Sequence, residues 1–226
     1  MLKNIIFEDN YIIVVNKPFG MLSCPDKKSV EKDLYSIIKE EKQCKDLAII
    51  NRLDRGVGGI VIFSKNNKVT TVLTEYMKNH TFKKKYLAIV CGVAKNEDTL
   101  IDWLMKNQRL NISKIVNKNS SGAKEARLSY KKISQIEVDK NTYSLVDINL
   151  ETGRHHQIRA QMANVNLPLY NDTKYNKNIK RKVGNKNIGL FCYQMEFKHP
   201  ITNKHLKYTI YPTNEEMFKK FHNLYK

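Results

Sequence analysis

The chain has 226 residues, of which 41% are hydrophobic, enough to form a buried core and to argue against a disordered protein. Its formal net charge is +18 and its pI is near 9.6, which most often indicates a polyanionic partner, with nucleic acid first. An AT-rich genome can also produce a lysine-rich protein, so lysine excess alone does not decide. No apolar run approaches the roughly 20 residues that span a bilayer.

The cysteines give no sign of a zinc site or a disulfide framework. Cys24, Cys44, Cys91 and Cys192 are widely spaced, and no two of them form a Cys-x-x-Cys pair. No secretory signal peptide begins the sequence. We therefore expect a soluble protein of the cytoplasm with no membrane association.

Apolar patterns in the first half predict alternating strands and helices. Residues 5–15 read as two short strands around an acidic turn. An amphipathic helix is expected over 29–42 with Ser29 as its N-cap, and another over 67–79. A buried strand is expected within 81–93.

The second half is less regular. Residues 95–127 show little periodicity, apart from a turn at 120–122. Strands are then expected at 126–136, 142–150, 190–197 and 205–211. A helix is expected to begin at Thr152 and Gly153, and a last one to follow a capping box at 213–216 and end near Leu224. The basic stretch 174–186 either follows RNA phosphates or is a solvated loop.

The residues around Asp54 combine charge with glycine. Arg52 and Arg55 flank the carboxylate and could keep it ionised and oriented. Three glycines follow within five residues, so a bulky ligand could come close to the backbone. The alternative is a tight hairpin with solvated charges. A phosphate loop of the Walker type fits poorly, because no Gly-Lys-Ser/Thr ends it.

Arginine is more informative than lysine in this chain. Only seven of the 40 basic residues are Arg, and four lie in two short segments: Arg52, Arg55, Arg154 and Arg159. Such clustering suggests positions where a planar, permanently charged group is required. In the expected helix after Gly153, His155 and Arg159 are four residues apart and would share a face suited to an anion. The histidine spacing argues against a metal site.

Two further side chains have a functional and a structural interpretation. Lys17, beside a Pro and a Gly, could face a phosphate or could be a solvated loop lysine. Tyr86, at the start of a buried strand, could stack on a base or could simply pack in the core. The residues alone leave both alternatives open.

Four segments in this order resemble the RluA-like family of pseudouridine synthases, and the resemblance covers nearly the whole chain. They are Ile-Val-Val-Asn-Lys-Pro-Phe-Gly at 13–20, Asn-Arg-Leu-Asp-Arg with its Gly-Gly at 51–59, Thr-Gly-Arg-His-His-Gln-Ile-Arg at 152–159, and Phe-Lys-His-Pro-Ile-Thr at 197–202. Each segment is only modestly specific, but the ordered set is highly specific.

The resemblance implies an enzyme that isomerises a uridine within RNA without metal or cofactor. Asp54 would be the essential carboxylate, Arg159 its ion-pair partner, and Tyr86 the residue stacked on the flipped uracil. Arg52 would fill the space that the base leaves, because extruding a nucleotide costs a few kcal/mol. Further RNA contacts are expected from a set of polar side chains in the same segments: Lys17, Arg55, Arg154, His156 and Gln157.

The resemblance also implies an α+β fold, with a bent, largely antiparallel mixed sheet, helices on its outer faces and a basic catalytic cleft. We expect residues 1–226 to form a single catalytic domain, without the family's frequent N-terminal RNA-binding domain, and to act as a monomer. Large-subunit ribosomal RNA is the preferred substrate and tRNA the alternative. A non-catalytic RNA-binding or ribosome-assembly protein, or a metal-dependent nuclease, would be the competing functions.

Several positions depart from the family pattern. Asn51 replaces a His, and Val57-Gly58-Gly59 lies where the pattern usually has Thr-Ser-Gly. Gln161 replaces a second His, and Phe191 stands where His is common. Asp54, Tyr86 and Arg159 are present. We expect the departures to affect the choice of substrate more than the chemistry.

Overall fold

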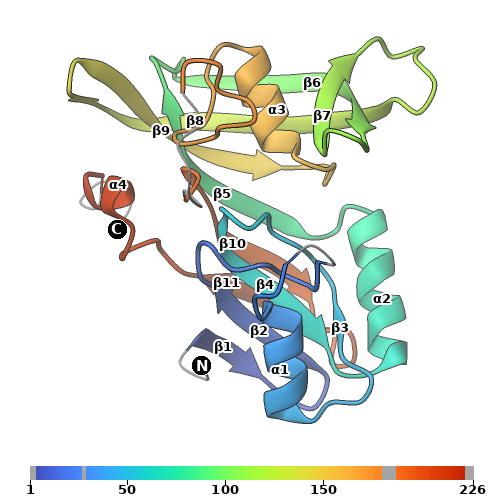
Figure 1. The fold of residues 1–226 in the computed structure, drawn as a ribbon. Helices are drawn as coiled ribbons and strands as arrows, with labels where there is room; N and C mark the ends of the chain where they lie inside the picture. The colour runs from blue at the N-terminus through green and yellow to red at the C-terminus, as the bar shows by residue number, and fades with distance from the viewer. Residues whose placement is uncertain (1–3, 27–28, 180–186, 222–226) are drawn as a thin grey trace. The chain divides into compact units, whose positions relative to one another are not determined.

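The computed structural model describes residues 4–26, 29–179 and 187–221. The chain divides into two compact units, each made of two chain segments. Unit 1 comprises residues 1–83 and 192–211, and unit 2 comprises residues 84–191 and 212–226. Figure 1 labels the helices and strands of both units.

Unit 1 is built on a sheet with the strand order β1-β2-β4-β10, with β3 paired to β4 and β11 to β10. Its strands are β1 (Ile5–Glu8), β2 (Ile12–Lys17), β3 (Ala48–Ile49), β4 (Gly58–Ser64), β10 (Leu190–Lys198) and β11 (His205–Thr209). Strands β2 and β4 are antiparallel, and every residue of β4 is buried. Because their β-branched and aromatic side chains fill both sides of the sheet, these two strands form the core of the unit.

Two capped helices complete unit 1 (Figure 1). Helix α1 (Leu34–Lys42) has its N-cap at Asp33, four residues after the predicted cap, and the Asp33 carboxylate accepts a hydrogen bond from the Ser36 amide at 3.0 Å. The predicted cap at Ser29 is therefore wrong. Helix α2 (Asn67–Lys78) confirms the prediction to within a residue, and Asn66 caps it.

Unit 2 contains an antiparallel sheet with the strand order β5-β9-β8-β6-β7. Its strands are β5 (Lys83–Cys91), β6 (Glu97–Asn107), β7 (Ile112–Val116), β8 (Lys124–Val138) and β9 (Asn141–Leu150). The predicted strands near 81–93, 126–136 and 142–150 are confirmed. Strands β6 and β7 fall in the stretch where periodicity predicted nothing, because only Leu100 and Leu104 of β6 are buried.

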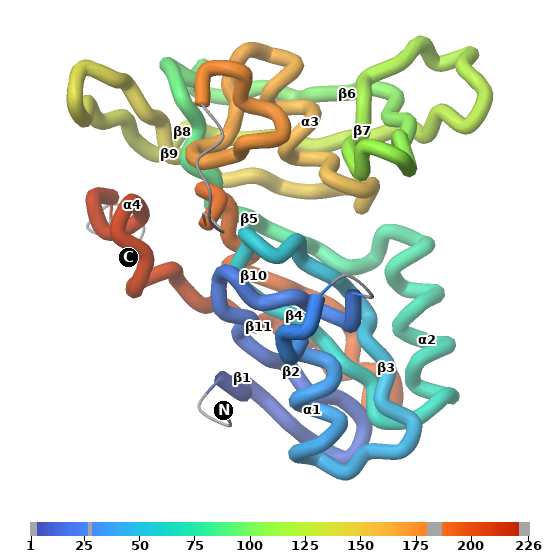
Figure 2. The backbone as a smooth tube through the Cα atoms, viewed as in Figure 1, coloured from blue at the N-terminus to red at the C-terminus, as the bar shows by residue number. Residues whose placement is uncertain are grey.

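One face of this sheet carries helix α3 (Gln157–Asn164), and we call it the α3 face. Ala126 and Leu104 lie on it and form a small core cluster with Ala160 of the helix. Residues that alternate with them, such as Arg127 and Lys131, lie on the opposite face. Figure 2 shows the chain after α3 turning back to lie beside the helix.

The predicted start of this helix is wrong. Residues 151–156 form turns, and His156 adopts a left-handed backbone with φ 51°, which cannot continue a right-handed helix. The helix therefore begins at Gln157, and His155 precedes it instead of sharing a helical face with Arg159.

At the carboxyl end, α4 (Glu216–Lys219) has Glu215 at its N-cap with no side-chain capping bond, so the predicted capping box is not formed. The predicted helix end near Leu224 and residues 180–186 of the basic stretch lie outside the described residues. No helix in the described part of the chain is long and apolar enough to cross a membrane. Few helices and mostly antiparallel strands confirm the α+β class.

Candidate active site

Asp54 lies in unit 1, in the connection between β3 and β4. The Val57 amide donates to the Asp54 carbonyl at 3.0 Å and closes a four-residue turn. The Asp54 side chain is half-buried, whereas Leu53 and Val57 on either side of the turn are buried. The segment is thus a turn whose two ends are fixed in the core and whose aspartate is partly exposed.

A second loop holds this turn from one side. The buried Ser23 hydroxyl donates to the Leu53 carbonyl at 2.7 Å and accepts from the Leu53 amide at 3.0 Å. Arg55 donates from Nε to the Gly20 carbonyl at 3.0 Å, and its guanidinium pairs with Glu31. Because the residues on both sides of Asp54 are bonded to the loop 20–23, the carboxylate is preorganised by its backbone.

Asn51 holds the turn from the other side. Its amide donates to the Ile60 carbonyl at 3.1 Å and accepts from the Ile62 amide at 2.9 Å. The side chain therefore extends the β3–β4 pairing in place of a backbone peptide. This gives the departure from the family's His a structural explanation.

Lys17 has neither of the two environments considered from the sequence. It is fully buried, and its Nζ donates to the carbonyls of Pro18 at 3.0 Å and Met21 at 2.7 Å. Burial lowers the pKa of Lys17 to about 7, against an opposing effect of the Asp54 charge. The interpretation as a solvated loop lysine is wrong, and burial does not fit direct contact with an RNA phosphate.

Gly59 has a packing function in place of the expected ligand approach. Its φ is +119°, and a Cβ at this position would lie 2.3 Å from the Cys192 carbonyl oxygen of β10. The missing side chain therefore admits a neighbouring strand. Arg52, by contrast, is exposed, with Nη1 3.9 Å from Cys24 Sγ.

Arg159 lies in unit 2, in helix α3, and is 5% exposed. Its Nε and Nη2 donate to the two carboxylate oxygens of Asp172 at 2.7 and 2.8 Å, a two-bonded ion pair between buried groups. The ring of Tyr175 lies 5.2 Å from the guanidinium carbon. The orientation of Arg159 is therefore fixed from within unit 2.

Tyr86 lies on the α3 face of the unit 2 sheet. Strand pairing aligns it with Ile148 of β9 and Tyr130 of β8, and it is 7% exposed. Unit 2 thus brings Tyr86 and the Arg159 helix to one face of one sheet, whereas Asp54 belongs to unit 1.

The segment before α3 shows two kinds of polar residue. Gln157 is 3% exposed and is hydrogen-bonded through both amide atoms, to Thr152, Arg154, Arg127 and Gln161. This use of its polar atoms does not fit the expected RNA contact. Arg154 and His156 are partly exposed: Arg154 Nε donates to the Glu125 carbonyl at 2.8 Å, and His156 Nδ1 lies 3.0 Å from the Tyr175 hydroxyl.

Three residues of these networks were missed from the sequence: Asp172, Ser23 and Tyr175. Each acts through a partner distant in sequence, and Ser23 and Leu53 are 30 residues apart. An acidic residue in the polar loop after α3 was the available signal for Asp172. It had no distinguishing pattern around it.

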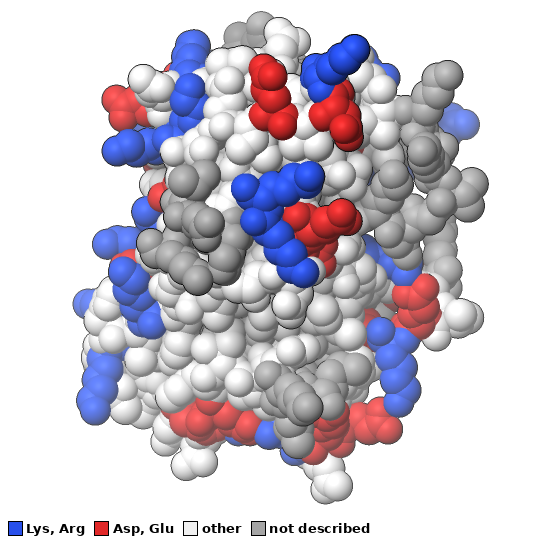
Figure 3. Space-filling view, turned by 90° about the vertical axis from the view of Figure 1, so that its left-hand side faces the viewer, with Lys and Arg blue, Asp and Glu red and all other residues white. Residues whose placement is uncertain are grey.

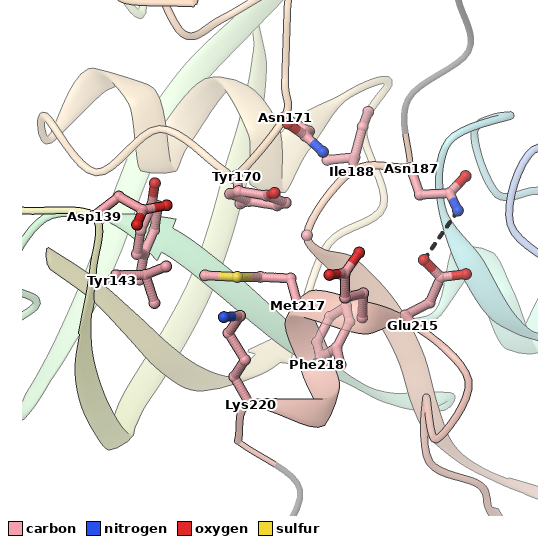
Figure 4. A pocket seen from close by; sticks show the side chains of 13 residues that line it. Asp139, Tyr143, Tyr170, Asn171, Asn187, Ile188, Glu215, Met217, Phe218 and Lys220 are labelled. Atoms are coloured by element: carbon pink, nitrogen blue, oxygen red, sulfur yellow. Dashed lines mark hydrogen bonds between the residues drawn. The ribbon is translucent and has the colours of Figure 1, made fainter. Parts of the chain in front are cut away.

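Three further features of the molecule are its surface charge, a cavity in unit 2 and its potential metal ligands. Figure 3 shows one face on which basic side chains are scattered among acidic ones and large uncharged areas. Unit 2 also has a cavity of about 400 Å³, where Tyr143, Tyr170 and Met217 face one another (Figure 4). None of the expected site residues lines it. Among the described residues, no group of three or more His, Cys, Asp or Glu could hold a metal ion.

Known proteins with similar sequences agree on one chemistry. The sequence model of the family described as RNA pseudouridylate synthase matches residues 11–164. A Vibrio parahaemolyticus protein named tRNA pseudouridine synthase C is 30% identical, over 96% of this chain and 94% of its own length. A Bacillus subtilis protein named uncharacterized RNA pseudouridine synthase YhcT is 29% identical, over 89% of this chain and 66% of its own length.

Solved structures show the same fold. Human RNA pseudouridylate synthase domain containing 1 aligns with a TM-score of 0.77 at 17% identity, over 95% of this chain and 85% of that one. Human RNA pseudouridylate synthase domain containing 4 aligns with a TM-score of 0.74 at 19% identity, over 99% and 93%. With a family match over more than half of its length, this chain belongs to the RNA pseudouridylate synthases, isomerases that act on RNA.

Proposed function

We propose that this protein converts specific uridines of transfer RNA to pseudouridine, with Asp54 as the essential carboxylate. The name tRNA pseudouridine synthase C, borne by a relative that aligns over nearly its whole length, supports tRNA as the substrate. The expected preference for large-subunit ribosomal RNA finds no support among these relatives. The observation that carries the role of Asp54 is its turn, clamped through Asn51, Leu53 and Arg55 around a half-buried carboxylate.

The reaction needs a group that stays in place while the base moves. The glycosidic bond must break, the uracil must turn, and its carbon 5 must bond to the sugar and then lose a proton. A carboxylate can act in this sequence as a nucleophile or as a base. Because Asp54 is held through the backbone on both sides, it keeps its position while the uracil turns.

We assign the supporting roles to two residues of unit 2. Arg159, whose orientation Asp172 fixes, would pair with the ionised Asp54, and Tyr86 would stack against the flipped uracil. Exposed Arg52 would fill the gap in the RNA. The two bonds to Asp172 hold the guanidinium in one orientation, so that it would meet a second carboxylate without turning.

The experiment exposes total RNA from a strain that lacks this gene to the purified protein and maps new pseudouridines chemically. We expect new marks in tRNA with the wild type and none with Asp54→Asn. Asp46→Asn is the matched control, because Asp46 is an exposed carboxylate eight residues earlier in the same unit. Marks confined to ribosomal RNA would refute the substrate, and equal marking by Asp54→Asn would refute the role of the carboxylate.

A further inference from the structure

The hairpin formed by β6 and β7 ends in an exposed turn of four residues, 108–111, which we call the hairpin tip. Gln108, Arg109 and Asn111 are exposed, and Leu110 exposes 56% of its surface. An arginine next to a protruding leucine offers both charge and apolar area. Nothing in the catalytic roles proposed above uses these residues.

Side chains from elsewhere in unit 2 hold the hairpin tip in place. His155 lies with Nε2 3.1 Å from Asn111 Oδ1 and with Nδ1 2.9 Å from Ser113 Oγ. The Ser113 hydroxyl donates to the His155 carbonyl at 2.6 Å. Lys174 Nζ donates to the Asn111 carbonyl at 2.9 Å. The tip is thus bonded to two separate segments, one before α3 and one after it.

The same network continues to Arg159. The Tyr175 hydroxyl accepts from the Ser113 amide at 2.6 Å and lies 3.0 Å from His156 Nδ1. The Tyr175 ring in turn contacts the Arg159 guanidinium. Hydrogen bonds and a ring contact therefore connect the hairpin tip to a residue with a proposed catalytic role, all within unit 2.

The surroundings of the tip are positively charged. Lys106 is aligned with Ser113 and Lys124 with Leu104 in the sheet, so both lysines lie on the α3 face. Arg109 of the tip and Lys174, which bonds to the tip, are exposed. Two acidic residues, Asp102 and Asp172, are bonded to helix α3 in the same part of unit 2. Asp102 accepts hydrogen bonds from Gln161 and Asn164, and Asp172 pairs with Arg159. Arg159 balances the charge of Asp172, so the four basic side chains at and beside the tip face one remaining carboxylate, Asp102, and the net charge of this group is positive.

We propose that the hairpin tip is an RNA-docking surface, on which Lys106, Arg109 and Lys174 bind phosphates and Leu110 lies against a ribose or a base. His155 is a positioning residue, which holds the tip in register with Arg159. The proposal rests on the proposed function, because it takes tRNA as the bound molecule. Phosphate contacts of this kind fix the position of an RNA without reading its sequence.

The test measures binding of unmodified tRNA, from the strain that lacks the gene, to protein carrying Asp54→Asn, over a range of salt concentrations. Adding Lys106→Ala and Arg109→Ala together is expected to raise Kd about tenfold and to reduce the salt slope of log Kd by roughly 1 to 2. Leu110→Ser is expected to raise Kd without changing the salt slope. Lys131→Ala is the matched control, because it removes an exposed lysine from the opposite face of the same sheet.

His155→Ala tests the positioning role through coupling. If His155 acts by holding the tip, His155→Ala and Arg109→Ala each raise Kd, and the double variant is no weaker than the worse single one. With Asp54 intact, the tip variants should raise KM and leave kcat at saturating tRNA within about twofold.

The outcomes separate the two proposals. If the wild type binds and modifies tRNA but the Lys106 and Arg109 variant keeps its Kd and salt slope, the docking surface is refuted and the function stands. An equally large loss of tRNA affinity in Lys131→Ala would also refute the docking surface, because a lysine on the opposite face would then contribute as much as the tip. If the wild type neither binds nor modifies tRNA, the proposed function fails, and the tip is refuted as a tRNA surface with it.

Discussion

The buried amine of Lys17 makes the stability of the protein depend on pH in a defined direction. In the folded protein its pKa is about 7, against an ordinary value of 10.5. Between these values the unfolded chain binds a proton that the folded protein does not bind, so the free energy of unfolding rises as pH increases. The full difference corresponds to roughly 5 kcal/mol, of which about 2 kcal/mol falls between pH 7 and pH 9.

Replacing Lys17 by Met removes the titrating group and nearly keeps the length of the side chain. Urea unfolding at pH 7, 8 and 9 gives the free energy for both proteins. The wild type should gain about 2 kcal/mol more than Lys17→Met across this range, whatever the constant cost of leaving the Pro18 and Met21 carbonyls without a donor. Lys131→Met, at an exposed position, should behave as the wild type does. Equal gains in the wild type and Lys17→Met would show that the pKa of Lys17 is not lowered in this range.

Other substitutions test single contacts. Gly59→Ala should lower the free energy of unfolding by more than about 3 kcal/mol, because the added Cβ would overlap the β10 backbone. Gly122→Ala is the control: its Cβ would meet no atom within 4 Å, so thermal melting should show a smaller loss of stability. Asp172→Ala should lower the free energy of unfolding, measured in urea, by about 3 to 5 kcal/mol, because the buried Arg159 cation loses its carboxylate. An unchanged urea midpoint would contradict the buried ion pair. Ser23→Ala should lower the free energy of unfolding by about 1 to 3 kcal/mol and lower kcat more than it raises KM, because Ser23 holds Leu53 beside Asp54. An unchanged kcat in steady-state kinetics would refute this positioning of the carboxylate.

The sequence was most informative where burial is strongest. Strands β2, β4 and β5 contain apolar runs, β9 alternates apolar and polar residues, and helix α2 repeats its apolar residues at helical spacing. Asp54 could be singled out because a carboxylate between two arginines is unusual at a strand connection. Each of these patterns involves only neighbouring residues, so it can be recognised in a single sequence.

The remaining features depend on contacts distant in sequence. Strand β6 has one polar face and few buried positions, so its apolar alternation is weak. The burial of Lys17 follows from two carbonyl acceptors in the loop after β2, a geometry that composition does not reveal. The partner of Arg159 lies 13 residues later in an irregular loop. Charge patterns predict that such groups need partners, but only the fold selects them.

Helix α3 is fastened to its sheet mainly by directional polar bonds. Six consecutive residues, 157–162, are buried, so the helix has no single apolar stripe on which it could slide. Gln157 bonds the Arg127 carbonyl, and Gln161 bonds the Leu100 and Ala126 carbonyls and Asp102. A shift by one turn would break all four of these bonds at once and leave the buried carbonyls of Leu100 and Ala126 without this donor. These bonds therefore prevent the helix from sliding along its own axis. Arg159 should keep its position relative to the sheet even when neighbouring apolar side chains are replaced.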